Sequence, residues 1–239
     1  GIPNGVVAGN HDVNHNEADY EEYYKYFGKA RYEDKPWYGG SPNNNRDHYD
    51  LISANGVDFI ILYLGWNIQA DTIKWANEVL AQYPDRHAII GTHEYISASG
   101  AYSGDGEKIW TEIVAKNKNV FMVLCGHIHG AAYNVKHQPD GRVVVEMLAD
   151  YQSGREGGGG YMRLLNFDME QGVIHVRTYS AYKDDENYYD DEGHDSFDIP
   201  FVKDLDGNDV NVINMRKQVA TDYIGVNVYT EDKIGVAEQ

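Results

Sequence analysis

The chain has 239 residues, and its 38 acidic residues outnumber its 20 Lys and Arg residues, so the formal net charge at pH 7 is −18. No basic patch is visible that could release counterions from DNA or RNA, so bulk nucleic-acid binding is not expected. No apolar run approaches the roughly 18 residues of a membrane-spanning helix, and no membrane span is expected either. The single cysteine, Cys125, excludes an intrachain disulfide and is expected to be a small buried residue.

The first half of the chain alternates expected strands and helices. Short apolar runs predict strands, and apolar residues at helical spacing predict helices. In chain order the expected elements are a strand at 5–8, a helix at 17–27, a loop at 35–46, strands at 48–54 and 57–64, a helix at 71–83 capped by Asp71, a strand at 88–91, a helix at 106–117 and a strand at 120–125. Asn55-Gly56 separates two of these strands and predicts a hairpin.

The second half is mostly β. Strands are expected at 131–136, 142–147, 161–168 and 173–179, joined by Gly-containing turns as a meander. The acidic stretch 184–198 is interpreted as a solvated loop, with a cation-binding loop as the alternative. We expect one domain over residues 1–202 and a C-terminal extension over 203–239.

Three apolar strands each run into a histidine-bearing turn. The turns are residues 9–12 (Gly-Asn-His-Asp), 91–94 (Gly-Thr-His-Glu) and 126–129 (Gly-His-Ile-His). Sites in α/β sheets gather at the carboxyl ends of strands. Five side chains are therefore expected at one sheet edge: Asn10, His11, His93, His127 and His129. Imidazole nitrogens and an amide oxygen suit Zn, Fe or Mn.

The number and the setting of these side chains favour a site. A lone histidine after a strand is usually a hydrogen-bonded loop residue, but five such side chains at three strand ends favour a site. Gly9, Gly91 and Gly126 are expected to let the chain leave each strand sharply. The histidines without the strand-end setting are interpreted as structural: His15, His48, His87, His137 and His175.

The three turns, in this order, resemble the third, fourth and fifth signature motifs of the calcineurin-like metallophosphoesterase family. The resemblance covers about residues 1–179 and is greatest to bacterial members, often secreted or surface-borne. It implies a mixed α/β (α+β) fold, a four-layer αββα sandwich with two mixed sheets. It also implies hydrolysis of a phosphomonoester or phosphodiester substrate by a water that two divalent metals (Mn, Fe or Zn) activate, and an extracellular or cell-surface location.

The resemblance also assigns roles to individual residues. It implies that Asn10, His93 and His127 hold one metal and that His129 holds the second. It places His11 over the scissile phosphate, with Asp12 as the carboxylate that orients His11.

The family's opening Asp-x-His and Gly-Asp motifs have no counterpart, since residues 1–8 contain neither Asp nor His. At most one metal and impaired activity are therefore expected for the chain as given. The chain is expected to be either a monomer of low stability or an oligomer that covers an exposed sheet edge. The alternative is a non-enzymatic surface module on the same fold that binds a sugar, Ca²⁺ or a protein. Residues 204–209 fit a β-turn better than an EF-hand loop.

Overall fold

The computed structural model describes residues 1–138, 140–189 and 192–201. They form two compact units. The first comprises Gly1–Tyr95 and Tyr102–His127, and the second comprises Ile96–Ala101 and the described residues from Ile128 onward. The expected extension at 203–239 and the loop at 204–209 lie outside the described residues, so both stay predictions.

The first unit is built on a mixed β-sheet. Its strands, in spatial order, are β1 (Tyr38–Gly40), β2 (His48–Ala54), β3 (Val57–Leu64), β4 (His87–Thr92) and β5 (Val120–Cys125). The first three pair antiparallel, and β3, β4 and β5 pair parallel. The hairpin predicted from Asn55-Gly56 is confirmed as β2–β3, with Ala54 opposite Val57. The parallel strands therefore direct their carboxyl ends to one edge of the sheet.

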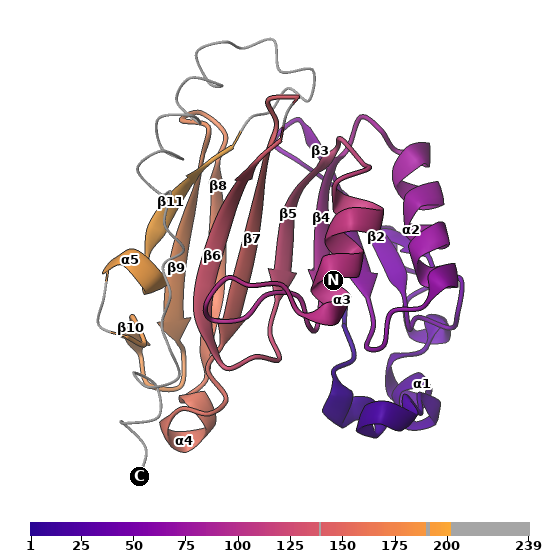
Figure 1. Ribbon diagram of the computed structural model, residues 1–239, viewed down its shortest axis with the longest axis horizontal. Coiled ribbons are helices and arrows are strands. Elements are labelled where there is room, and N and C mark those ends of the chain that lie inside the picture. The colour runs from indigo at the N-terminus through magenta and orange to yellow at the C-terminus, as the bar shows by residue number, and fades with distance from the viewer. Residues whose placement is uncertain (139, 190–191, 202–239) are drawn as a thin grey trace. The chain divides into compact units, whose positions relative to one another are not determined.

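Helices accompany this sheet. They are α1 (Glu21–Phe27), α2 (Ala70–Gln82) and α3 (Gly104–Ile109), which continues into a π-helical turn at Trp110–Val114. Three 3-10 segments occur at Asn10–Val13, His15–Glu17 and Lys29–Arg31. Asn117 Nδ2 donates to Asn77 Oδ1 at 2.6 Å, so α2 and the α3 region lie side by side (Figure 1).

The core of the first unit is apolar and closed. Ile60, Leu62 and Leu64 of β3 are fully buried, as is Ile90 of β4. Each such side chain contributes about 1.5–3 kcal/mol to folding. From the helices, Leu80 of α2 is also buried. The apolar runs that predicted these strands therefore form the core, and polar residues follow at the strand ends.

The second unit is mainly antiparallel. β6 (Gly130–His137) pairs with β7 (Val143–Asp150). A second sheet contains β8 (Tyr161–Asp168), β9 (Val173–Ser180), β10 (Asp185–Glu186) and β11 (Phe197–Pro200), and its pairings are all antiparallel. Two short helices, α4 (Arg155–Gly158) and α5 (Glu192–Asp195), complete the described elements. A mixed α/β chain with two sheets agrees with the sandwich fold class expected from the sequence.

The first elements of the chain differ from those predicted from the sequence. Residues 5–8 form no strand, because their backbone is held by single contacts such as Tyr23 Oη to Val6 O at 2.9 Å. The helix predicted at 17–27 begins only at Glu21, since Ala18 takes a left-handed φ of 48°. The cap of α2 is Gln69 and not Asp71.

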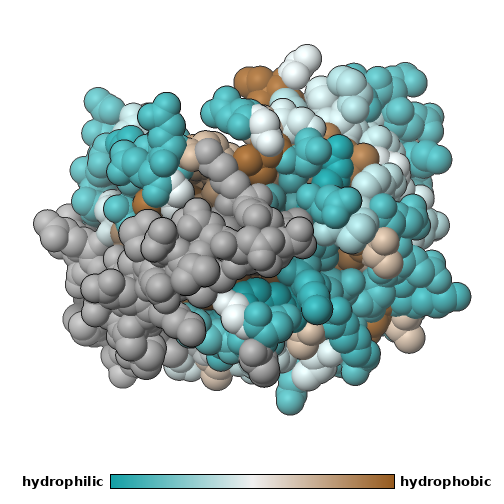
Figure 2. Space-filling model, turned by 90° about the horizontal axis from the view of Figure 1, so that it is seen from above, coloured by the Kyte–Doolittle hydropathy of each residue, from teal (hydrophilic) through white to brown (hydrophobic). Residues whose placement is uncertain are grey.

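Some later expectations also changed. The acidic stretch is not a wholly solvated loop, because it contains β10, α5 and β11, and Asp195 is fully buried. Cys125 is half-buried, whereas a buried residue was expected. No helix among the described residues is long and apolar enough to cross a membrane. The described atoms in Figure 2 show mostly hydrophilic residues, with apolar ones in small patches.

Candidate metal centre

The carboxyl ends of β3, β4 and β5 carry three aromatic side chains in mutual contact. Trp66 follows β3, His93 follows β4 and His127 follows β5. The His93 and His127 rings lie 4.8 Å apart between centroids. The Trp66 ring lies 5.5 Å from His93 and 5.1 Å from His127. The parallel pairing of the strands produces this cluster, as the sequence pattern predicted for the two histidines.

Asn10 joins the histidines from the N-terminal segment. Its Oδ1 lies 2.9 Å from His93 Nε2, and the residue is only 8% exposed. The structure therefore brings together Asn10, His93 and His127, with His93 in contact with both of the others. This contact joins Asn10 and His93, which are 83 positions apart in the chain.

The turn that carries Asn10 and His11 is fixed by its own side chains. Asp12 Oδ2 accepts a hydrogen bond from Gly9 N at 2.8 Å, which closes a capping box around the 3-10 segment. Asp12 thus holds the turn itself, whereas the resemblance implied a role in orienting His11. The His11 side chain is exposed, so a substrate can reach it.

His15, interpreted from the sequence as structural, belongs to this group. Its Nδ1 lies 3.1 Å from Asn10 Nδ2, and its ring lies 4.5 Å from that of His11. Trp66 Nε1 donates to His15 O at 3.0 Å. In the sequence, only the short spacing between His11 and His15 indicated that His15 belongs to this group. No sequence pattern indicated that Trp66 does.

The backbone at the third turn is strained. His127 has a left-handed φ of 68°, a conformation that non-glycine residues adopt at a cost and that clusters at functional sites. The strained backbone is therefore at His127, whereas the sharp exit from the strand had been expected at Gly126.

His129 lies in the second unit. Its Nε2 lies 2.9 Å from Gln152 Nε2, in the loop after β7. The second-metal role of His129 stays a prediction, and Gln152 is a neighbour that the sequence did not indicate.

The donor set of Asn10, His93 and His127 suits a divalent ion. Two donors at about 2.1 Å from one ion lie roughly 3.0–3.4 Å apart, for angles between a right angle and the tetrahedral value. Asn10 Oδ1 and His93 Nε2, at 2.9 Å, are near the lower end of this range. Within the described residues, no three or more His, Cys, Asp and Glu side chains form a group that could hold a metal. The third donor of this set is an amide, and all three donors are neutral. The residues present therefore fit one ion with an open coordination shell.

The sheet topology and the donor group together define an α/β protein with a candidate metal centre at the carboxyl edge of its parallel strands. The family model of the calcineurin-like phosphoesterases matches residues 3–131. The chain belongs to the calcineurin-like phosphoesterase family.

A curated bacterial protein is similar over the whole chain. "Uncharacterized protein YvnB" of Bacillus subtilis (strain 168) is 50% identical over 247 aligned residues. The alignment covers 100% of this chain and 18% of that protein. The chain therefore spans less than a fifth of the relative's length.

Proposed function

We propose that the protein hydrolyses a phosphomonoester or phosphodiester with the help of divalent metal ions. The observation that carries this proposal is the contact group of Asn10, His93 and His127 at the carboxyl edge of the parallel strands. The phosphoesterase family membership supports it. The extracellular or surface location inferred from the resemblance stays part of this proposal.

In the proposed reaction, Asn10, His93 and His127 would hold one ion, and the resemblance assigns His129 to a second. Bound ions in such sites lower the pKa of a water and offset the charge that develops on the phosphate. We assign to the exposed imidazole of His11 the donation of a hydrogen bond to a phosphate oxygen or of a proton to the leaving oxygen. Asp12 fixes the turn that carries His11, through the hydrogen bond that its carboxylate accepts from Gly9 N.

The test is turnover of an aryl phosphate by the longest natural form of the protein, with added Mn²⁺. His11→Ala should lower kcat by at least about 100-fold, the usual contribution of general acid catalysis. His175→Ala is the matched control, because His175 lies in the second sheet, paired with Asp198 at 2.7 Å. Unchanged turnover in the His11 variant would remove His11 from the mechanism.

Metal content tests the same proposal independently of activity. The 239-residue chain should bind at most one ion, since its three converging donors are neutral and two adjacent dications need negative ligands. His93→Ala should abolish that binding. If no natural form of the protein binds metal or hydrolyses the aryl phosphate, the result would instead favour a non-enzymatic binding module.

A further inference from the structure

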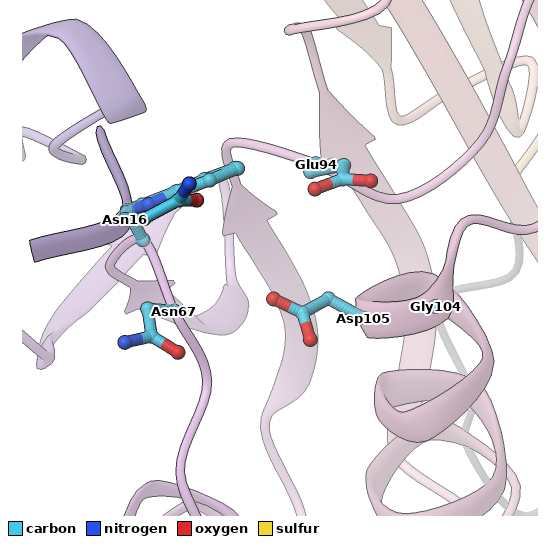
Figure 3. Close-up of a pocket in the computed structure, with 6 residues that line it drawn as sticks. Asn16, Asn67, Glu94, Gly104 and Asp105 are labelled. Atoms are coloured by element: carbon cyan, nitrogen blue, oxygen red, sulfur yellow. The ribbon is translucent and has the colours of Figure 1, made fainter. Parts of the chain in front are cut away.

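A pocket of about 280 Å³ lies in the first unit beside His93 and His127. Its polar lining comes from Asn16, Asn67, Glu94 and Asp105, and its aromatic wall is Trp66. Figure 3 shows Asn16 and Asn67 on one side of the pocket and Glu94 and Asp105 on the other. The volume suits a small organic group and not a whole macromolecule.

The pocket shares a wall with the candidate metal centre. Trp66 lines the pocket and also contacts the rings of His93 and His127. Glu94 directly follows His93 in the chain. A phosphoester with its phosphorus near the histidines would therefore place one of its ester groups in this pocket.

The shared wall is held rigidly. Tyr20 Oη donates to Trp66 O at 2.9 Å, and the Arg46 guanidinium donates to the carbonyl oxygens of Trp66 and Asn67. Asp47, fully buried, accepts from Gly65 N at 2.9 Å. Asn67 itself has a left-handed φ of 66°. A strained segment fixed by this many bonds is typical of a pre-organised binding wall.

The charge of the lining selects among ester groups. The lining contains two carboxylates and no Lys or Arg. Asp105 is paired with Lys108 of α3 at 2.9 Å. Glu94 forms no ion pair with another described residue, so its charge is not offset. A second phosphate or a carboxylate would be repelled here, and a cation would gain both the carboxylate and the indole face.

We propose that this pocket binds the positively charged part of an amino-alcohol phosphoester. The proposal deepens the proposed function and rests on it for the position of the phosphorus. A neutral polyol could use the two amides, but it would leave the charge of Glu94 without a counterion. That occupant is therefore an outcome of the test.

The test compares diesters that differ in one group. p-Nitrophenyl phosphorylcholine carries a cationic choline group, p-nitrophenyl 3,3-dimethylbutyl phosphate has the same shape without the positive charge, and a glyceryl ester represents the polyol. In the longest natural form of the protein with Mn²⁺, kcat/KM for the choline ester should exceed that for the dimethylbutyl ester about tenfold, through cation–π and ion-pair contacts. Glu94→Gln should bring this ratio close to one, and Asp105→Asn should lower it.

A carboxylate outside the pocket serves as control. Glu78 lies on the surface of α2 beside Lys74, and Glu78→Gln should keep the ratio. A ratio near one in the unmodified protein, a ratio that survives Glu94→Gln, or a preference for the glyceryl ester would overturn the proposal.

A binding measurement separates this proposal from the proposed function. If none of the esters is hydrolysed, the proposed function fails, and the pocket is still tested by Trp fluorescence with choline and with 3,3-dimethylbutanol. Quenching by choline alone, lost in both Trp66→Phe and Glu94→Gln, would support the cation pocket. Equal responses to the two alcohols, or none, would refute it.

Discussion

Gly9 and His93 lie in direct contact, and a Cβ atom at position 9 would stand 2.6 Å from His93 Cε1. Gly9 itself has φ −95° and ψ 175°, an extended conformation open to any residue. Glycine is therefore needed here for space and not for a sharp exit of the chain, which was the role expected from the sequence. The close approach lets His93 reach Asn10.

Gly9→Ala should weaken metal binding, because the added methyl displaces the His93 ring from Asn10. Overpacking of this kind also lowers the free energy of unfolding by about 1–3 kcal/mol. Metal titration and urea unfolding measure the two effects. Gly91→Ala is the control, since its Cβ would meet Tyr63 at an ordinary 3.6 Å. Equal metal affinity in the two variants would show that the contact has no functional role.

His15→Ala should lower metal affinity about tenfold, in the range typical of residues that orient metal ligands. His15 Nδ1 faces Asn10 Nδ2 at 3.1 Å, which keeps Asn10 Oδ1 directed at His93. His15→Gln keeps an acceptor near Asn10 and should recover part of the affinity. A purely structural residue would show a stability loss with unchanged affinity, so unfolding curves are recorded beside the metal titrations, with His175→Ala as reference.

Asp47→Asn should destabilise the first unit and loosen the loop that carries Trp66. The buried Asp47 carboxylate accepts from Gly65 N, from Thr72 Oγ1 at 2.7 Å and from Asn43 Nδ2 at 2.7 Å. An amide turns one acceptor into a donor, and an unsatisfied buried group costs about 1–3 kcal/mol. Urea unfolding gives the value. Asp58→Asn, at a side chain 55% exposed, should change stability little, and a similar loss in both variants would contradict this account.

Asp50→Asn should stabilise the protein at alkaline pH. Asp50 is 1% exposed, and neither carboxylate oxygen has a hydrogen-bond partner in the described part of the chain. Burial raises the pKa of Asp50 from 3.8 to about 7, so its contribution to stability is present below pH 3.8 and is lost as the pH rises through about 7. The variant should gain about 2–4 kcal/mol over the unmodified chain at pH 8 and almost nothing at pH 4.

The neighbouring His48 has the opposite pH dependence. Burial lowers the pKa of His48 from 6.5 to about 4, so stability is lost as the pH falls from 6.5 towards 4. The Asp50→Asn variant should therefore lose stability on acidification. In the unmodified chain, Asp50 partly offsets this loss. Urea unfolding at pH 4, 6 and 8 measures both trends, with the exposed Asp85→Asn as control. A gain independent of pH would rule out the titration of Asp50 as its cause.

The sequence alone determined the features that depend on residues close together in the chain. Alternating apolar runs and Asn55-Gly56 are local signals, and the β2–β3 hairpin follows from them. The ends of β4 and β5 are also local, so the positions of His93 and His127 at one sheet edge could be predicted.

Only the tertiary structure decided which distant groups meet. His15 is close to Asn10, Trp66 lies against His93 and His127, and Asp50 is buried. Apart from the short spacing between His11 and His15, the sequence has no local pattern for these contacts, because each depends on where other segments of the chain pack. Residues 5–8 make the same point, since a β-branched run becomes a strand only where a partner strand offers its hydrogen bonds, and here single contacts take that place.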